Sequence, residues 1–180
     1  AIRNANDGIS LAQTAEGALG KIGDMLQRMR ELAVQAANAT NSTGDLQNLD
    51  AEYQQLALEI DRTITTTQFN GQTILTVSGG QDFQAGANAG EVVTITTTDL
   101  SGTFAAGDIL TQASASAQLA TIDAALDDFN GSRALYGAAQ NRFEAVIASL
   151  QIAAENQAAA RGRIMDADFA SETANLSRAQ

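Results

Sequence analysis

The residue types that most often carry catalysis or bind metals are scarce in this chain of 180 residues. It has no histidine and no cysteine, which excludes zinc sites, cysteine nucleophiles and Ser-His-Asp triads. Acidic pairs remain, and such pairs can hold a divalent cation or act as acid and base. They are Asp127 with Asp128, Asp166 with Asp168, and Glu59 with Asp61. None has a second type of ligand at a recognisable spacing, so we interpret them as solvated helix faces and caps, and we predict no enzyme, metal or cofactor.

Charge and composition restrict the partners. The formal net charge is -11 and the sequence pI is about 4.2, which opposes binding to nucleic acid or to an anionic lipid surface. No run of 18 apolar residues occurs, so we expect no insertion into a membrane. Apolar residues make up 44% of the chain but aromatic residues only 4%. This composition favours closely packed helices over a wide ligand pocket.

The first part of the chain has the apolar spacing of a long helix that packs along its whole length. Apolar residues recur in alternating steps of three and four, the pattern of a coiled-coil seam. We expect a helix over about residues 3 to 39, roughly 55 Å long at 1.5 Å per residue. The predicted seam consists of Leu11, Ala15, Ala18, Ile22, Met25, Met29, Leu32 and Ala36.

A second helix is expected after the polar segment NATNSTGD, where Ser42 or Thr43 can cap its first turn. Its seam contains Leu46, Leu49, Tyr53, Leu56 and Ile60, and it can fold back antiparallel on the first helix. The threonine-rich run from Thr63 then weakens helix propensity, because β-branched residues lose rotamer freedom in a helix.

Residues 67–112 change character, with glycines separating short β-prone runs such as EVVTITTT. Asn70 and Gly71 fit either a type I′ hairpin turn or a glycine at a helix end or in a loop. A two-stranded ribbon is marginally stable in water, so we expect this insertion to pack against the helices.

A third helix is predicted from about residue 114 onward, with a length that exceeds 45 residues. Its apolar stripe is Leu119, Ile122, Leu126, Phe129, Tyr136, Phe143, Ile147, Leu150 and Ile164. The expected fold class is therefore mostly α, a long antiparallel helical bundle or coiled coil of three long helices with a small β-hairpin insertion. We expect residues 1–66 and 113–180 to form one helical rod, and residues 67–112 to be a small β-rich insertion and not an independent domain.

Several motifs, in order, resemble bacterial flagellin. They are LQRMRELAVQAANATN (Leu26 to Asn41), EIDRTITTTQFNGQTIL (Glu59 to Leu75), YGAAQNRFEAVI (Tyr136 to Ile147) and ARGRIMDADFASETANLSRAQ (Ala160 to Gln180). The resemblance implies the rod that is called D1 in that family. Flagellins carry further helical segments at both ends, which form the inner tube of the filament, so we expect this chain to be a fragment without them.

The resemblance also implies a function. The chain would be a secreted, extracellular subunit of the bacterial flagellum that self-assembles into a helical propeller for swimming motility. Its partners would be other flagellin subunits, an export chaperone and the filament cap. The alternatives are a hook-filament junction protein, and a cell-surface adhesin or polysaccharide-binding module.

Flagellins are ligands of toll-like receptor 5 in their hosts, so the resemblance implies a receptor-binding surface for innate immune recognition. Residue by residue, it falls on Gln27, Arg28, Leu32, Glu52 and Arg142. Leu32 also lies on the predicted seam, where it would be a core residue. Exposed charged residues are the expected contacts between subunits; they are Asp24, Arg30, Glu31, Arg62 and Arg133.

Overall fold

The computed structural model describes residues 1–165 and 169–180. The helices in these ranges are α1 (Ile2–Ala36), α2 (Thr43–Thr66), α3 (Gln112–Met165) and α4 (Phe169–Ala179). The strands are β1 (Gln68–Phe69), β2 (Gln72–Thr73), β3 (Gly79–Gln84) and β4 (Val92–Thr97), which form two antiparallel pairs, β1 with β2 and β3 with β4. The predicted fold class, three long helices with a small β insertion, is confirmed.

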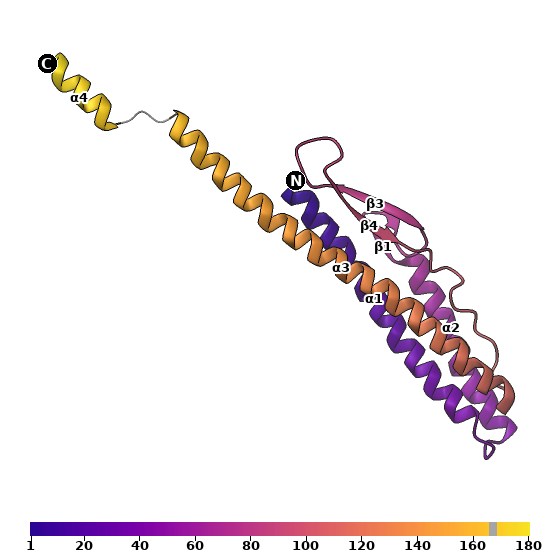
Figure 1. Ribbon diagram of the computed structural model, residues 1–180. Helices are drawn as coiled ribbons and strands as arrows, with labels where there is room; N and C mark the ends of the chain where they lie inside the picture. The colour runs from indigo at the N-terminus through magenta and orange to yellow at the C-terminus, as the bar shows by residue number, and fades with distance from the viewer. Residues whose placement is uncertain (166–168) are drawn as a thin grey trace.

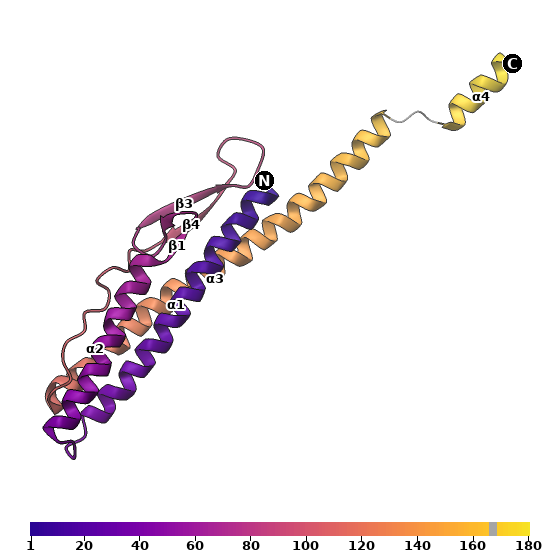
Figure 2. The same cartoon turned by 180° about the vertical axis from the view of Figure 1, so that it is seen from behind.

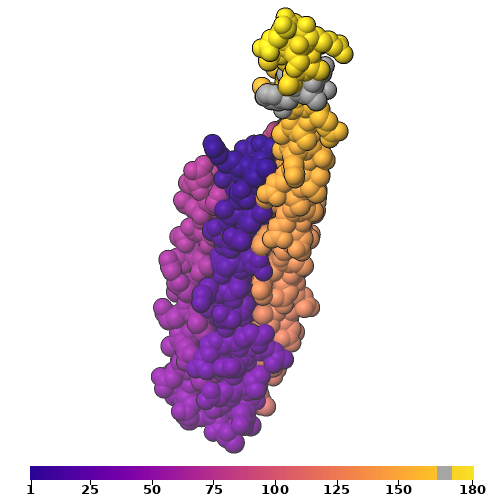
Figure 3. All heavy atoms as spheres, turned by 90° about the vertical axis from the view of Figure 1, so that its left-hand side faces the viewer, coloured from indigo at the N-terminus to yellow at the C-terminus, as the bar shows by residue number. Residues whose placement is uncertain are grey.

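Helix α1 lies between the other two long helices, as the space-filling view shows (Figure 3). Both α2 and α3 run antiparallel to α1 (Figure 1). Since α2 has 24 residues and α1 has 35, α2 covers about 36 Å of a rod that α1 extends to about 52 Å. The β3–β4 hairpin lies beside the N-terminal part of α1, beyond the end of α2 (Figures 1 and 2). The hairpin thus covers the length of α1 that α2 leaves open.

The core runs along α1, but its stripe differs in part from the predicted seam. Leu11, Ile22 and Met29 are buried as predicted, whereas Ala18 and Met25 are only partly buried. Leu19 and Leu26 are fully buried in their place. The reason is that α1 packs against two helices, so its buried stripe is wider than the seam between a single pair.

The other two predicted stripes are also buried in part. On α2, Tyr53 and Ile60 are buried, while Leu46, Leu49 and Leu56 are partly buried. On α3, the buried members of the stripe are Ile122, Phe129, Tyr136 and Phe143. Ile164 was wrongly placed in this stripe, because its side chain is 81% exposed. Ile164 is the second-last residue of α3, and the C-terminal end of this helix continues past the start of α1 (Figure 1).

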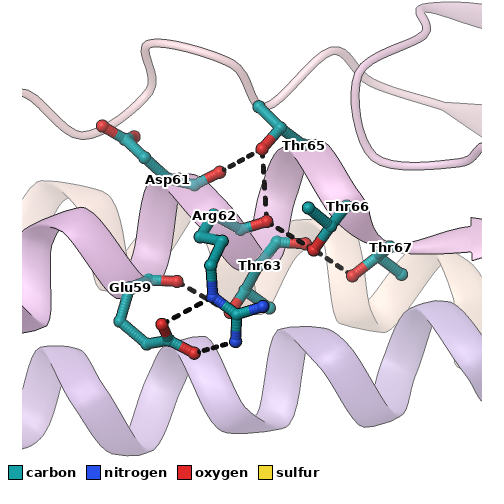
Figure 4. Close-up of polar contacts among 7 residues, drawn as sticks. All are labelled: Glu59, Asp61, Arg62, Thr63, Thr65, Thr66 and Thr67. Atoms are coloured by element: carbon teal, nitrogen blue, oxygen red, sulfur yellow. Dashed lines mark hydrogen bonds and ion pairs between the residues drawn. The ribbon is translucent and has the colours of Figure 1, made fainter.

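Helix α2 begins and ends with side-chain hydrogen bonds to its own backbone. Ser42 accepts a hydrogen bond from the Asp45 amide at 3.2 Å, and the Ser42 amide donates to Oδ2 of Asp45 at 3.0 Å, which completes a capping box. At the other end, the hydroxyl groups of Thr65 and Thr66 donate to the carbonyls of Asp61 and Arg62 (Figure 4). Such bonds compete with the helix, and the helix ends at Thr66.

The turn between β1 and β2 is type I′. Asn70 and Gly71 have φ values of 50° and 79°, and they join the paired residues Phe69 and Gln72. Of the two interpretations of this dipeptide, the hairpin turn is the one found.

A polar network ties the long connection before α3 to the helices. The Tyr53 hydroxyl donates to Oε1 of Gln118 at 3.0 Å, and Gln54 donates to the carbonyl of Gly107 at 2.9 Å. The Ile109 amide donates to Oδ1 of Asp50 at 2.9 Å. Burial, with the nearby Asp50 charge, raises the pKa of Tyr53 to about 12, so its hydroxyl stays protonated and keeps donating at neutral pH.

Candidate functional site

In the described part of the chain, the acidic pairs are not gathered into a larger cluster of carboxylates. Over those residues, no group of three or more His, Cys, Asp or Glu side chains is placed to hold a metal ion. Glu59 forms an ion pair with Arg62, whose hydrogen bond lowers the pKa of Glu59 (Figure 4). A general acid needs the opposite shift. Asp127 and Asp128 are exposed on α3, and the pair Asp166 and Asp168 lies outside the described residues.

Within residues 1–165 and 169–180, no helix is both long and apolar enough to cross a membrane.

Arg28 and Glu52, two of the proposed receptor contacts, form an ion pair that bridges α1 and α2. Nε of Arg28 donates to Oε1 of Glu52 at 2.8 Å, and Nη1 donates to Oε2 of Glu31 at 2.9 Å. The hydrogen bond with Glu52, and then that with Glu31, raises the pKa of Arg28. The Arg28 and Glu52 side chains are 50% and 47% exposed, so this is a solvated cluster with one positive and two negative charges. Gln27 is exposed beside it on α1.

Leu32 is placed differently from the other proposed contacts. It is one helical turn after Arg28, but its side chain is 1% exposed and belongs to the core. The seam therefore predicted its position correctly. In this structure, Leu32 packs in the core and does not itself face solvent.

Arg142 lies far along the rod from Arg28. Its neighbour Phe143 approaches Gly8 of α1, and Gly8 and Arg28 are separated by about 30 Å of helix at 1.5 Å per residue. Nη1 of Arg142 donates to the carbonyl of Thr94 in β4 at 3.4 Å. The structure thus brings Arg28 and Glu52 together, and leaves Arg142 beside the β3–β4 hairpin.

Several of the charged residues expected to join subunits are engaged within the chain. Arg30 on α1 pairs with Asp123 on α3 at 2.8 Å, Arg28 pairs with Glu31, and Arg62 pairs with Glu59. Asp24 and Arg133 are exposed.

Sequence reasoning missed the contacts that fix the hairpin on the helices. The rings of Phe83 and Phe143 meet edge to face with centroids 5.5 Å apart. Asn4 of α1 donates from its side-chain amide to the carbonyl of Gln84 at 3.1 Å. These residues are far apart in the sequence, and no local spacing predicts their contact. The one signal present was Gly8, a glycine in the first helix at the point where Phe143 approaches it.

Comparisons with known proteins match most of the chain. Residues 1–82 match the model of the bacterial flagellin N-terminal helical region, and residues 119–180 match that of the C-terminal helical region. A flagellin of Halalkalibacterium halodurans is 46% identical over 185 residues, which cover 99% of this chain and 68% of that protein.

Solved structures agree in fold. A Bacillus cereus flagellin is 34% identical with a TM-score of 0.77, covering 89% of this chain and 95% of that chain. A putative flagellar hook-associated protein of Vibrio parahaemolyticus has a TM-score of 0.76, covering 89% of this chain and 88% of that chain. At 14% identity, it shares the fold alone.

Proposed function

Because this chain belongs to the bacterial flagellin family, we infer that it is an extracellular structural subunit of the flagellar filament, which self-assembles for swimming motility. The observation that carries this function is the match of both helical regions in one chain, together with 46% identity over 99% of its length. Flagellins are structural proteins and not enzymes. The continuous core along α1 suits a subunit that must transmit force along a rod.

We propose that the helices of residues 1–66 and 113–180 form one mechanical unit, to which residues 67–112 are attached without folding alone. Hydrogen bonds across this boundary support the proposal: the Tyr136 hydroxyl donates to the Ile74 carbonyl at 3.3 Å, and the Gln54 side-chain amide donates to the Gly107 carbonyl at 2.9 Å. The buried side chains of Ile74 and Leu75 belong to the same core as the helices.

The proposed partners before assembly are an export chaperone and the filament cap. A subunit that is exported unfolded must refold at the growing tip. The chain has no proline and no cysteine, so neither prolyl isomerisation nor disulfide exchange slows that step.

A single engineered cysteine tests the filament role. In the gene that encodes this chain, the substitution Ala89→Cys places one thiol in an exposed loop of a chain that otherwise has none. A fluorescent maleimide added to living cells is expected to label the whole length of each filament. Cells with the unsubstituted gene are the control. Label confined to the base of the filament would contradict the proposal and indicate a junction protein, and label spread over the cell surface would indicate an adhesin.

We propose further that Gln27, Arg28 and Glu52 form a contact surface for host toll-like receptor 5, with Leu32 packed beneath and Arg142 as a separate contact along the rod. The geometry supports this because the Arg28 and Glu52 side chains are about half exposed and are held together across two helices. A cluster that is already ordered loses less entropy on binding than free side chains do.

The receptor test uses Arg28→Ala, with Arg62→Ala as the matched control. Both arginines are exposed and pair with a glutamate three residues away, and Arg28 also pairs with Glu52 across the two helices. Each variant therefore loses exposed ion pairs, which contribute little to stability. We expect Arg28→Ala to raise the Kd for the receptor ectodomain by about tenfold or more, and Arg62→Ala by less than about twofold. Circular dichroism checks that both variants remain helical. Equal affinities of the two variants would reject the surface.

Leu32→Ala is unsuitable for this test. Removing a buried leucine side chain costs about 2 to 5 kcal/mol of stability, so a loss of binding in that variant would report on folding as well as on contact.

A further inference from the structure

The chain contains two Asn-Gly dipeptides, and the fold puts them in opposite environments. Asn70 and Gly71 form the exposed turn between β1 and β2, whereas Asn130 and Gly131 lie inside the long helix α3. We propose that Asn70 is a site of spontaneous deamidation and that the helix protects Asn130 from the same reaction.

The reacting groups of the Asn70 turn are not engaged elsewhere in the described part of the chain. Gly71 follows Asn70 without a side chain, and a Cβ built on it would meet nothing within 4 Å. Among the hydrogen bonds of residues 1–165 and 169–180, none uses the Gly71 amide or the Asn70 side chain. Asn70 also has a φ of 50°, a region that residues other than glycine adopt at a cost.

The reaction is balanced with water as the one co-reactant. The Gly71 backbone nitrogen, after losing its proton, attacks Cγ of Asn70, and the side-chain nitrogen leaves as ammonia. The resulting succinimide joins Cγ of Asn70 to the Gly71 nitrogen in a five-membered ring. Water then opens the ring at either of its two carbonyls, which gives aspartate or isoaspartate at position 70.

Asn130 is also followed by a glycine, but its backbone conformation is helical. In an α-helix, the amide of residue 131 donates to the carbonyl of residue 127, so the attacking nitrogen is held in the ladder. Gly131 lies far from both ends of α3, which spans Gln112–Met165. Attack would require that helix to open locally, and this costs free energy.

The change at Asn70 would alter its surroundings. Asn70 shares a surface hollow with Asp7, Phe69 and Phe83, so either product adds a second carboxylate to the hollow that Asp7 lines. The isoaspartate product also lengthens the main chain by one carbon within a two-residue turn, which disturbs the pairing of Phe69 with Gln72.

The test is incubation of the folded chain at mildly alkaline pH, followed by cleavage after glutamate and mass spectrometry. Glu91 lies between the two dipeptides, so Asn70 and Asn130 fall in separate peptides. We expect the peptide with Asn70 to gain the mass of an amide-to-acid exchange and to show isoaspartate, at a rate that rises with pH. The peptide with Asn130 should remain unchanged over the same period.

Two controls keep the proposal falsifiable. In concentrated denaturant both peptides should react, which shows that the fold accounts for the difference. The variant Asn70→Asp, which keeps a residue type tolerated at positive φ, has no side-chain amide to lose and should show no gain of mass at position 70. If Asn70 in the folded chain stays intact while the denatured chain reacts, or if both sites react equally in the folded chain, the proposal is wrong.

Discussion

At the scale of single residues, Gly8 and Gly17 both lie within α1 but have different neighbours. A Cβ built on Gly8 would lie 2.5 Å from Cζ of Phe143, which is itself buried and meets the ring of Phe83 edge to face. A Cβ on Gly17 would meet nothing within 4 Å. The first glycine is required by packing and the second is not.

We therefore expect Gly8→Ala and Gly17→Ala to change stability in opposite directions. Gly8→Ala should lower the free energy of unfolding by about 1 to 3 kcal/mol, because the ring of Phe143 must move. Gly17→Ala should raise it by up to about 1 kcal/mol, because alanine loses less backbone entropy in a helix. Urea denaturation followed by circular dichroism measures both. Stabilisation by Gly8→Ala would show that α1 and α3 do not approach closely at this point.

At the scale of elements, α2 begins with a capping box, in which Ser42 and Asp45 form reciprocal hydrogen bonds. The hydrogen bonds from the Ser42 hydroxyl and amide lower the pKa of Asp45 below its ordinary value. A carboxyl group with a lowered pKa in the folded state stabilises the fold above its unfolded pKa. This contribution is lost as the pH falls through the folded pKa.

Ser42→Ala should therefore be most harmful at neutral pH. We expect a loss of about 1 kcal/mol at pH 7, because the cap for the first turn is removed. The difference from the unsubstituted chain should begin to shrink as the pH falls below about 4, the ordinary range of an aspartate pKa. It should be smallest below the lowered pKa of Asp45, where this carboxyl group is protonated in both chains. Thr43→Ala, on the neighbouring exposed residue, is the control and should change stability little. Urea titrations at several pH values provide the measurement, and a deficit independent of pH would contradict the role of Asp45.

At the scale of the whole molecule, α3 is longer than α1 and α2, the other two long helices of the rod. The C-terminal part of α3 continues beyond the N-terminus of α1 (Figure 3), and residues 151–160 are all exposed. Farther back, Ile122, Phe129 and Phe143 of the same helix are buried against the rest of the rod. A helix without tertiary packing is marginally stable in water.

Hydrogen exchange should therefore divide α3 into two parts. We expect amides of residues 151–160 to exchange quickly in the isolated chain, and those of residues 122–143 to exchange slowly, because only the second part is packed in the core. Exchange monitored by mass spectrometry at neutral pH resolves the two segments. Uniform slow exchange along α3 would mean that the projecting part is stabilised in a way that the single chain does not show.

Sequence reasoning captured the features that depend on neighbours in the chain. The polar segment before the second helix indicates a cap at Ser42 or Thr43, and Ser42 is the residue that caps α2. The long helices follow from apolar spacing in a chain without proline. The turn at Asn70 was left with two interpretations, because glycine permits both, and the strands on either side decided between them.

The proposed receptor contacts also divide into what the sequence indicated and what only the structure showed. Motif matching identified Arg28 and Glu52, and the structure joins them across two helices. The motifs could not show that Leu32 faces inward or that Arg142 lies beside Thr94. Both facts depend on how the helices are rotated and where the hairpin is attached.

By itself, the sequence determined the class of this protein: its long helices and the lack of histidine and cysteine are properties of single residues and their spacing. The tertiary structure alone decided which residues of each stripe are buried, where the hairpin packs and which part of α3 projects. The physical reason is that these features depend on contacts between residues far apart in the sequence. Such contacts are selected by packing of the whole rod, and local spacing does not specify them.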